Sequence, residues 1–324
     1  MSVDRKKITK NAYRITKVRG KTALRIRVPG GHLDAKHFTL IQEIAQTYGN
    51  GTVHLTARQG FEVPGIDFEH MEAINKKILP LLESLDLAIE VDSGGYPAAG
   101  TRNISACVGD RVCPFANDDT TDMAKEIEKR IYPNNLHFKV AVTGCPNDCI
   151  KAHMQDFGII CITEPQYDVS RCVSCEACVT NCKKKVTGAL VMNEFNVERD
   201  HEKCIGCGEC ILKCPTGAWT RGDQKLFRMV IMGRTGKRNP RIAMPFIKWG
   251  DRETMIRVIE NTYAFVERYI DKSLPKEHIG YIVDRVGYHT FKREVLEGIE
   301  INPEAQVAES IQWNGYWYKD GLNF

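Results

Sequence analysis

The chain has 324 residues and a formal net charge of +4, from 45 basic and 41 acidic side chains. Its length allows a sizeable core and roughly two or three domains, and its modest charge gives no reason to expect a nucleic-acid partner. No segment is apolar for long enough to span a bilayer, and the opening residues MSVDRKKITKNAYR lack the apolar stretch of a secretory signal. We therefore expect a cytoplasmic protein with no membrane span.

The pattern of residues 1–92 predicts a small α+β unit. Apolar side chains at helical spacing, such as Met71, Ile74 and Ile78, indicate helices, and the sequence Gly-Asn-Gly at 49–51 indicates a turn. The predicted elements are a strand over Ala23–Pro29, a helix from Leu33 to Tyr48, a strand over Thr52–Ala57 and a helix over Asp67–Leu85. With a further strand before the last helix, the order is compatible with a ferredoxin-like fold.

Cysteines divide the rest of the chain. Residues 93–165 combine cysteine-bearing loops with a predicted helix over Asp119–Ile131 and a predicted strand over His137–Thr143. Residues 166–222 hold the densest cysteine runs. Residues 223–324 contain no cysteine and are expected to form a strand over Phe227–Met232, a basic loop and then helices. Because this last segment looks like the resumption of the domain begun by residues 93–165, we interpret residues 166–222 as an insertion.

Twelve of the thirteen cysteines fall into three groups, which leaves Cys161 as the remainder. In a reducing compartment such thiols do not pair as disulfides, and closely spaced thiolates suit metals that bind sulfur. Cys161 lies in the apolar run Gly-Ile-Ile-Cys-Ile, where a buried and inert thiol is the ordinary case.

Two of the groups have the C-x2-C-x2-C-x3-C spacing of bacterial two-cluster ferredoxins. In that pattern three thiolates of a run hold one 4Fe-4S cluster, and the fourth holds the cluster of the other run. The first crossed set is then Cys172, Cys175, Cys178 and Cys214, and the second crossed set is Cys204, Cys207, Cys210 and Cys182. The alternative is a pair of zinc sites, although zinc motifs usually separate their thiol pairs by a longer loop.

The third group, called the split set here, has a different spacing. It consists of Cys107 and Cys113 (C-x5-C) together with Cys145 and Cys149 (C-x3-C). Because Pro146 suits the first position of a helix, we expect Cys145 and Cys149 one turn apart at a helix start, where the helix dipole favours anionic thiolates.

The split set resembles the cluster-and-siroheme signature of the sulfite and nitrite reductase family. Three further segments support the resemblance. The run His54 to Gln59 is similar to the family's T-x-R-Q strand, Thr101-Arg102-Asn103 is similar to its R-N element, and His137-Phe138-Lys139 matches its K-x-K element only at Lys139. The resemblance implies an α+β fold with a ferredoxin-like N-terminal module (1–92), a siroheme and 4Fe-4S domain in two parts (93–165 and 223–324) and an inserted two-cluster ferredoxin domain (166–222).

The resemblance also implies residue roles. Cys149 would be the thiolate shared between the cluster and the siroheme iron, with Cys107, Cys113 and Cys145 as cluster ligands only. Arg58, Arg102 and Lys139 would bind the substrate anion, Lys139 would also deliver protons, and His137 is a further candidate proton donor. Thr56, Gln59 and Asn103 would touch the macrocycle. The siroheme carboxylates need cationic partners, for which the candidates are Arg234, Lys237, Arg238 and Arg241.

The function implied is the six-electron reduction of sulfite to sulfide by a catalytic subunit with siroheme and three 4Fe-4S clusters. The sequence contains no dinucleotide or flavin fingerprint, so we expect companion subunits with flavin and Fe-S centres to oxidise NADH. Larger relatives contain two copies of this module, which predicts a homodimer in which Arg58, Arg102 and Lys139 of one copy serve the siroheme of its mate. The alternatives are a siroheme nitrite reductase, a non-catalytic electron-transfer subunit and a zinc-stabilised interaction protein.

Overall fold

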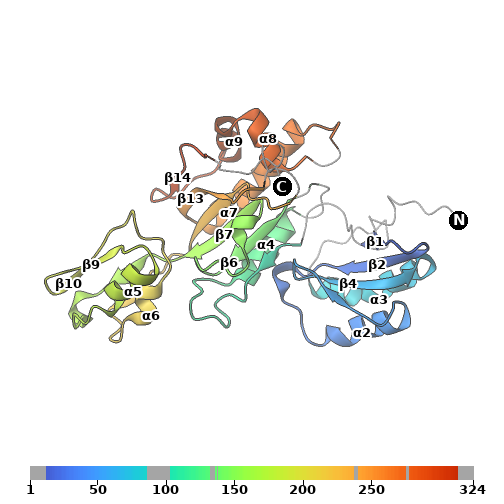
Figure 1. Ribbon diagram of the computed structural model, residues 1–324, viewed down its shortest axis with the longest axis horizontal. Helices are drawn as coiled ribbons and strands as arrows, with labels where there is room; N and C mark the ends of the chain where they lie inside the picture. The colour runs from blue at the N-terminus through green and yellow to red at the C-terminus, as the bar shows by residue number, and fades with distance from the viewer. Residues whose placement is uncertain are drawn as a thin grey trace, which may run out of the picture. The chain divides into compact units, whose positions relative to one another are not determined.

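The computed structural model describes residues 12–85, 103–131, 136, 138–236, 240–274 and 277–312. The chain forms two compact units (Figure 1). The first contains Met1–Ala106 and Thr121–Val140, and the second contains Cys107–Thr120 and Ala141–Phe324.

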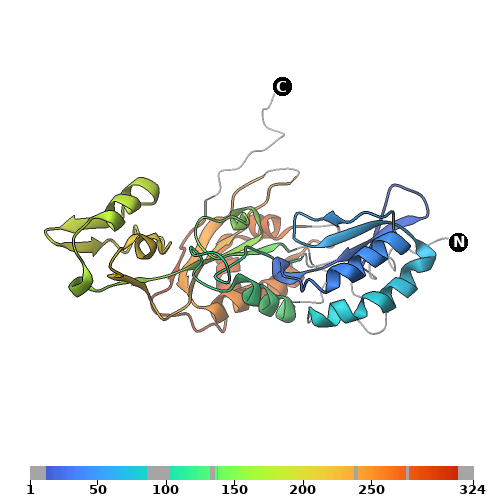
Figure 2. The same cartoon turned by 90° about the horizontal axis from the view of Figure 1, so that it is seen from below.

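The first unit contains a four-stranded antiparallel sheet. Its order is β1 (Tyr13–Ile15), β2 (Lys21–Ile26), β4 (Phe61–Asp67) and β3 (His54–Leu55). The helices α2 (His37–Thr47) and α3 (Met71–Ser84) cover one face of this sheet (Figure 2). Their apolar stripes pack on Leu24, Ile26 and Val28 of the β2 segment, which are all fully buried. Arg25 and Arg27 alternate with these three residues, so their side chains lie on the opposite side of the segment.

The predicted elements of this unit exist, with shifted ends. The strand predicted over Ala23–Pro29 corresponds to β2. It ends at Ile26, because Pro29–Gly31 form a 3-10 helix in which Gly30 adopts a φ of 70°. The strand predicted over Thr52–Ala57 corresponds to β3, which contains only His54–Leu55, since the chain turns between Thr56 and Gly60. The last helix begins at Met71 after a 3-10 turn at Phe68–His70.

Helix α4 (Thr120–Ile131) follows the first cysteine pair, close to its predicted bounds. Within the first unit, the fully buried Glu128 of α4 forms an ion pair with Arg27. Burial raises the pKa of Glu128, and the neighbouring Arg27 guanidinium works against that rise. The pair therefore compensates two charges that water does not reach.

The second unit contains most of a six-stranded sheet. In sheet order the strands are β14 (Gln306–Val307), β13 (Met244–Gly250), β12 (Leu226–Ile231), β7 (Phe157–Ile162), β6 (Val140–Thr143) and β5 (Ser105–Ala106), of which the first four pair antiparallel. All six residues of β7 are buried, including Cys161, as its apolar sequence predicts. Burial raises the pKa of the Cys161 thiol well above its ordinary value, which keeps it neutral and inert.

Strands β7 and β12 are neighbours in the sheet, although residues 163–225 separate them in the sequence. Ile162 at the end of β7 pairs with Leu226 at the start of β12. Between them, β8 (Pro165–Tyr167) and β11 (Trp219–Arg221) pair antiparallel and form a neck. The segment enclosed by the neck contains η5 (Val169–Arg171), α5 (Ala177–Lys185), the hairpin β9 (Leu190–Asn193) and β10 (Asn196–Arg199), and α6 (Glu209–Lys213). The sheet is thus continuous across this segment, and the interpretation of residues 166–222 as an inserted domain remains a prediction.

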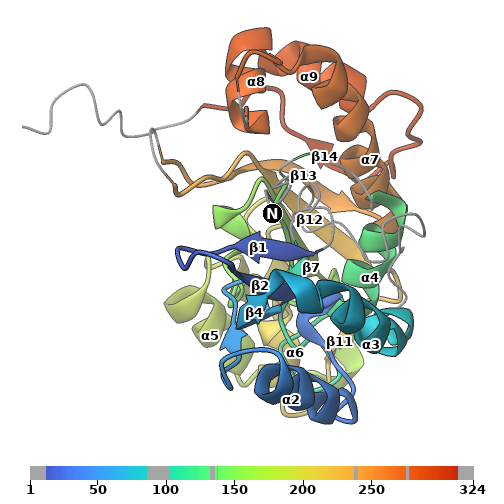
Figure 3. The same cartoon turned by 90° about the vertical axis from the view of Figure 1, so that its right-hand side faces the viewer.

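Three helices complete the second unit: α7 (Arg252–Tyr269), α8 (Ile279–Val286) and α9 (Tyr288–Val295) (Figure 3). The Asp251 carboxylate accepts a hydrogen bond from the Thr254 amide at 2.7 Å and so caps the start of α7. Phe246 of β13, Phe265 of α7 and Phe291 of α9 are buried together, with the rings of Phe265 and Phe291 5.2 Å apart.

Strand β7 has no room for a methyl group at Gly158. A β-carbon there would lie 2.5 Å from the carbonyl oxygen of Ala152 and 2.7 Å from Val230. We expect Gly158→Ala to lower the free energy of unfolding by about 1 to 3 kcal/mol, because the overpacked strand must shift. Urea denaturation of the purified variant measures this loss. The matched control is Gly236→Ala, where nothing lies within 4 Å of the added carbon. Equal stability of the two variants would contradict the prediction.

Candidate functional site

The four thiols of the split set come together in the second unit. The backbone amide of Cys107 donates to the Val142 carbonyl of β6 at 3.1 Å, which fixes the first loop beside the strand that leads to Cys145. The Gly144 amide donates to the Cys107 sulfur at 3.0 Å. Burial raises the pKa of the Cys145 thiol, and the thiols of Cys113, Cys107 and Cys149 raise it further. The other three thiols of the set therefore lie close enough to Cys145 to act on its charge.

The members of the split set differ in exposure. Cys145 is buried, Cys107 and Cys113 are half-buried, and Cys149 is exposed. A cluster ligand that also bridges to a second group needs an open side, and within this set Cys149 has it. The donor set therefore suits a thiolate-bound cluster with one sulfur accessible to a further metal centre.

The helix expected at Pro146 is absent from the described residues, so that prediction is wrong. The chain from Cys145 to Lys151 consists of turns, and Asp148 adopts a left-handed conformation with a φ of 48°. A second left-handed residue, Lys151, precedes the short 3-10 helix Ala152–Met154. Two such residues cannot belong to a continuous right-handed helix, so a helix dipole does not stabilise these thiolates.

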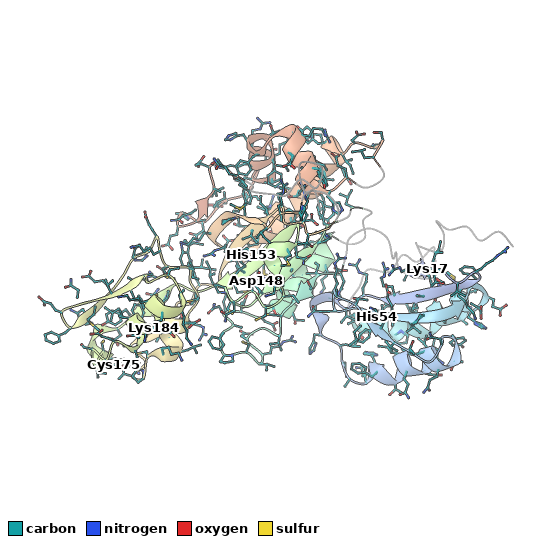
Figure 4. The ribbon with its side chains drawn as sticks, in the orientation of Figure 1. Lys17, His54, Asp148, His153, Cys175 and Lys184 are labelled. Atoms are coloured by element: carbon teal, nitrogen blue, oxygen red, sulfur yellow. The ribbon has the colours of Figure 1, made fainter. Side chains whose placement is uncertain are left out.

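Asp148 holds this loop in place instead (Figure 4). Its carboxylate accepts hydrogen bonds from the amide of Ala152 at 2.6 Å and the amide of His153 at 3.2 Å, and it lies 2.7 Å from the His153 ring. Burial by itself would raise the pKa of Asp148, but these hydrogen bonds outweigh it and lower the pKa. The two side chains thereby fix the backbone on both sides of Cys149.

The two ferredoxin-type runs each bring a thiol to the other run. One cavity, with an empty volume of about 300 Å³, is lined by all four members of the first crossed set, and a second, of about 370 Å³, by all four of the second crossed set. This is the grouping that the spacing predicts. Helix α5 makes the exchange possible because it carries Cys178 toward the first cavity and Cys182 toward the second.

The protonation of these thiols depends on their surroundings. Burial raises the pKa of Cys207 to about 11 and that of Cys210 to about 12. Burial also acts to raise the pKa of Cys214, but hydrogen bonds from the Thr216 hydroxyl and nearby amides lower it to about 7. A cation must displace protons from the most buried thiols, so metal binding at these sites releases protons and depends on pH.

A cationic cavity of about 830 Å³ lies in the first unit. Its lining includes three residues that the sequence singled out, Thr56, Arg58 and Asn103. The Thr56 hydroxyl accepts from the Gly60 amide at 3.0 Å and closes the turn that carries Arg58. The Asn103 amide group donates to the Arg58 carbonyl at 2.5 Å and to the Val28 carbonyl at 2.9 Å. Asn103 thus fixes the backbone of Arg58.

Three more arginines line the cavity, and the sequence reasoning missed them: Arg14, Arg25 and Arg27. A signal was present, because Arg25 near the end of β2 and Arg27 just after it alternate with Leu24, Ile26 and Val28 and so share the face opposite α2 and α3. Glu62 forms ion pairs with Arg14 at 3.5 Å and with Arg25 at 3.0 Å. The Asn103 side-chain oxygen is buried and has no hydrogen-bond partner among the residues that the structure describes.

Gln59 has a different role from its neighbours. Its backbone has a φ of 63°, and its side-chain amide donates to the Ala106 carbonyl at 2.7 Å and accepts from the Ala106 amide at 2.8 Å. Both ends of the amide are therefore engaged by the residue that precedes Cys107. In this arrangement Gln59 positions the backbone, and its expected contact with a macrocycle remains a prediction.

The basic loop of the second unit is only partly described. Arg234 and Arg241 are 4% and 6% exposed and both pair with Asp284 of α8. Arg234 also lies 3.8 Å over the Tyr281 ring. These contacts fasten the loop to α8. Lys139 is half-buried directly before β6, whereas Arg102, His137, Lys237 and Arg238 lie outside the described residues.

Two features are absent from the described residues. No group of three or more His, Cys, Asp or Glu side chains is arranged to hold a single metal ion, which is a different geometry from a cubane with one thiolate per iron. Among the same residues, no helix combines the length and apolarity that crossing a membrane demands.

Convergent thiols beside a continuous sheet, together with an arginine-lined cavity, are the features expected of an iron–sulfur oxidoreductase. The family model for the nitrite and sulphite reductase 4Fe-4S domain matches residues 98–302, and that for the nitrite/sulfite reductase ferredoxin-like half domain matches residues 16–81. The chain belongs to the nitrite and sulphite reductase family. Membership implies siroheme and a 4Fe-4S cluster, which the thiols of the split set suit.

Similar proteins support this assignment. The chain is 41% identical over 309 residues to the subunit designated C of the anaerobic sulfite reductases of Salmonella typhimurium and Salmonella typhi, covering 94% of this chain and 92% of those proteins. The crystal structure of dissimilatory sulfite reductase I superimposes with a TM-score of 0.67 over 91% of this chain and 72% of that one. At 18% identity the second likeness supports the fold alone.

The Asp148 contacts generate a prediction about pH. We expect Asp148→Asn to lower the stability of the purified protein by about 1 to 3 kcal/mol near neutral pH, because it removes a charge-assisted acceptor. The pKa of Asp148 is lowered in the folded chain, so its stabilisation is present above its ordinary pKa of about 4 and is lost as the pH falls through the lowered value. Thermal unfolding of variant and parent from neutral to acid pH measures the difference, which should shrink in acid. The exposed Asp223→Asn is the control, and a difference independent of pH would count against the role of the carboxylate.

Proposed function

We propose that this chain is the catalytic subunit of a siroheme sulfite reductase, which reduces sulfite to sulfide. The observation that carries the proposal is the convergence of the split set in a chain that aligns over 94% of its length with a sulfite reductase subunit. Sulfur passes from the +4 to the −2 state, so the anion must stay bound while six electrons and several protons arrive. Both a stable electron-carrying site and a cationic pocket are needed.

The split set is the proposed site of the catalytic cofactors. Cys107, Cys113, Cys145 and Cys149 hold a 4Fe-4S cluster, and the Cys149 thiolate is shared with siroheme. Its exposure supports this role. When bound, siroheme supplies an iron with an open position for the substrate anion. The Asp148 and His153 contacts keep the loop around Cys149 in one conformation.

The arginine-lined cavity is the proposed anion site. Arg58 binds the oxyanion, together with Arg102, and Lys139 and His137 hold and deliver protons. Thr56 and Asn103 act on Arg58 through the turn and the backbone contact described above. Asn103 also lines this cavity, and its buried side-chain oxygen, which has no partner among the described residues, is an acceptor that suits a water molecule.

Residues 166–222 are the proposed two-cluster ferredoxin domain, which brings the number of clusters to three. The two cavities lined by crossed cysteines and the neck between β8 and β11 support this assignment. The proposed partners are companion subunits with flavin and Fe-S centres that oxidise NADH, and a second copy of this chain whose Arg58, Arg102 and Lys139 serve the siroheme of its mate.

Cys149→Ser tests the cofactor assignment. We expect the variant, purified without oxygen from a siroheme-producing host, to lose the siroheme absorption bands and sulfite turnover while retaining iron in the crossed sets. The buried Cys161→Ser is the control, since the thiol at 161 lies outside the three sets. Parent protein with iron and sulfide but no tetrapyrrole absorbance would favour the electron-transfer alternative, and colourless protein would favour zinc.

Arg58→Ala tests the anion site. Loss of one charge-assisted contact should reduce kcat/KM for sulfite by about ten- to a hundredfold. Steady-state rates with sulfite and with nitrite measure the effect and separate the two candidate substrates. The matched control is Arg19→Ala, an exposed arginine outside the cavity. A parent enzyme with a higher kcat/KM for nitrite would overturn the assignment to sulfite, and an unaffected Arg58→Ala enzyme would remove Arg58 from the site.

A further inference from the structure

The second crossed set is joined directly to the sheet of the second unit. The loop that carries Cys204 and Cys207 contains Gly206, whose carbonyl accepts a hydrogen bond from the Thr163 amide at 2.9 Å, just beyond β7. A β-carbon on Gly206 would lie 2.8 Å from Ile162 and 3.0 Å from the Trp249 ring. The loop is therefore seated on the sheet so closely that only glycine fits, at a φ of 69°.

One residue, Asn117, links this loop to the split set. A β-carbon on Gly208 would lie 3.1 Å from the Asn117 side-chain oxygen, so this side chain contacts the loop between Cys207 and Cys210. The backbone amide of Asn117 donates to the Gly144 carbonyl at 2.7 Å, and the backbone amide of Gly144 donates to the Cys107 sulfur at 3.0 Å. Two residues, Asn117 and Gly144, thus span the space between the second crossed set and the split set.

The sheet also places cations beside the second crossed set. Arg228 of β12 donates to the Ile205 carbonyl at 3.3 Å, and Lys248 of β13 donates to the Glu202 carbonyl at 3.4 Å. Burial lowers the pKa of both groups, and both are close enough to Cys204 for its thiol to oppose that shift. Two partly buried cations therefore face this set from the sheet.

The first crossed set has different surroundings. The residues that line its cavity run from Cys172 to Trp219, all within the insertion. Cys175 is exposed, and so are two apolar neighbours on that side, Val173 at 63% and Phe195 at 77%. The Ser174 hydroxyl donates to the Phe195 carbonyl at 2.8 Å, which holds these two loops together. This set is open to solvent on a side that an electron donor can reach.

From these contacts we infer that the second crossed set is the inner site, nearer the split set, and that Arg228 raises the reduction potential of the cluster held there. The inference rests on the cofactors assigned under the proposed function. Reduction adds negative charge to a thiolate-bound cluster, and a partly buried cation stabilises that charge. Electrons that enter at the first crossed set then meet a more favourable acceptor on the way inward. Asn117 and Gly144 position the inner loop against the split set.

The test is a redox titration of the full chain, purified without oxygen and monitored by electron paramagnetic resonance. We expect Arg228→Gln to shift one ferredoxin-type signal to lower potential, and that signal should be the one that interacts magnetically with the split-set cluster. Arg228→Lys keeps the charge and should restore the potential. The matched control is Arg171→Gln, an exposed cation next to Cys172, which should leave the inner signal unmoved.

The outcomes separate the inference from the function on which it rests. A shift in the signal that lacks magnetic interaction with the split-set cluster, or no shift in either signal, would overturn the inference even in a protein with siroheme absorbance and sulfite turnover. The expected shift in a protein without siroheme absorbance would support the role of Arg228 and refute the proposed catalytic function.

Discussion

The antiparallel pairing of β7 with β12 is the constraint on which the second unit depends. Both strands are almost entirely buried, so a slip of register would turn charged Arg228 into the core and expose apolar residues. The pairing of Ile162 with Leu226 brings the two ends of the segment 163–225 together. It also sets Thr163 beside Gly206, and it places Arg228 against the loop of Cys204. One strand pair therefore fixes both the ends of this segment and the surroundings of Cys204.

Burial makes several of the cysteine thiols costly to ionise. Burial raises the pKa of Cys207 and Cys210, so without a metal these side chains are neutral near pH 7. A metal bound as proposed would supply the compensating positive charge, and the protein adds amide donors such as that of Gly144 and cations such as Arg228. The crossed sets and the split set would therefore offset the negative charge of their thiolates by the same means, although their spacings differ.

Much of this arrangement could be predicted from the sequence, because cysteine spacing is a local property and cluster ligation constrains it strongly. The grouping of the crossed sets required only the known exchange of the fourth ligand. The helix at Pro146 was predicted wrongly, since residue preference favours it but the carboxylate of Asp148 stabilises a left-handed turn. The contacts of Asn117 and Arg228 could not be predicted, because only the folded sheet brings Asn117 to the loop of Gly208 and Arg228 to the carbonyl of Ile205.

The arginine-lined cavity shows why a small net charge says little about a site. The chain carries only +4 overall, yet one cavity gathers Arg25, Arg27 and Arg58. Carboxylates offset the first two: Glu62 pairs with Arg25, and Glu128 pairs with Arg27. These ion pairs lower the cost of holding arginines close together, and they fix the guanidinium groups in place before an anion arrives. An oxyanion that binds there, as proposed, would meet cations that are already oriented, so less conformational entropy would be lost on binding.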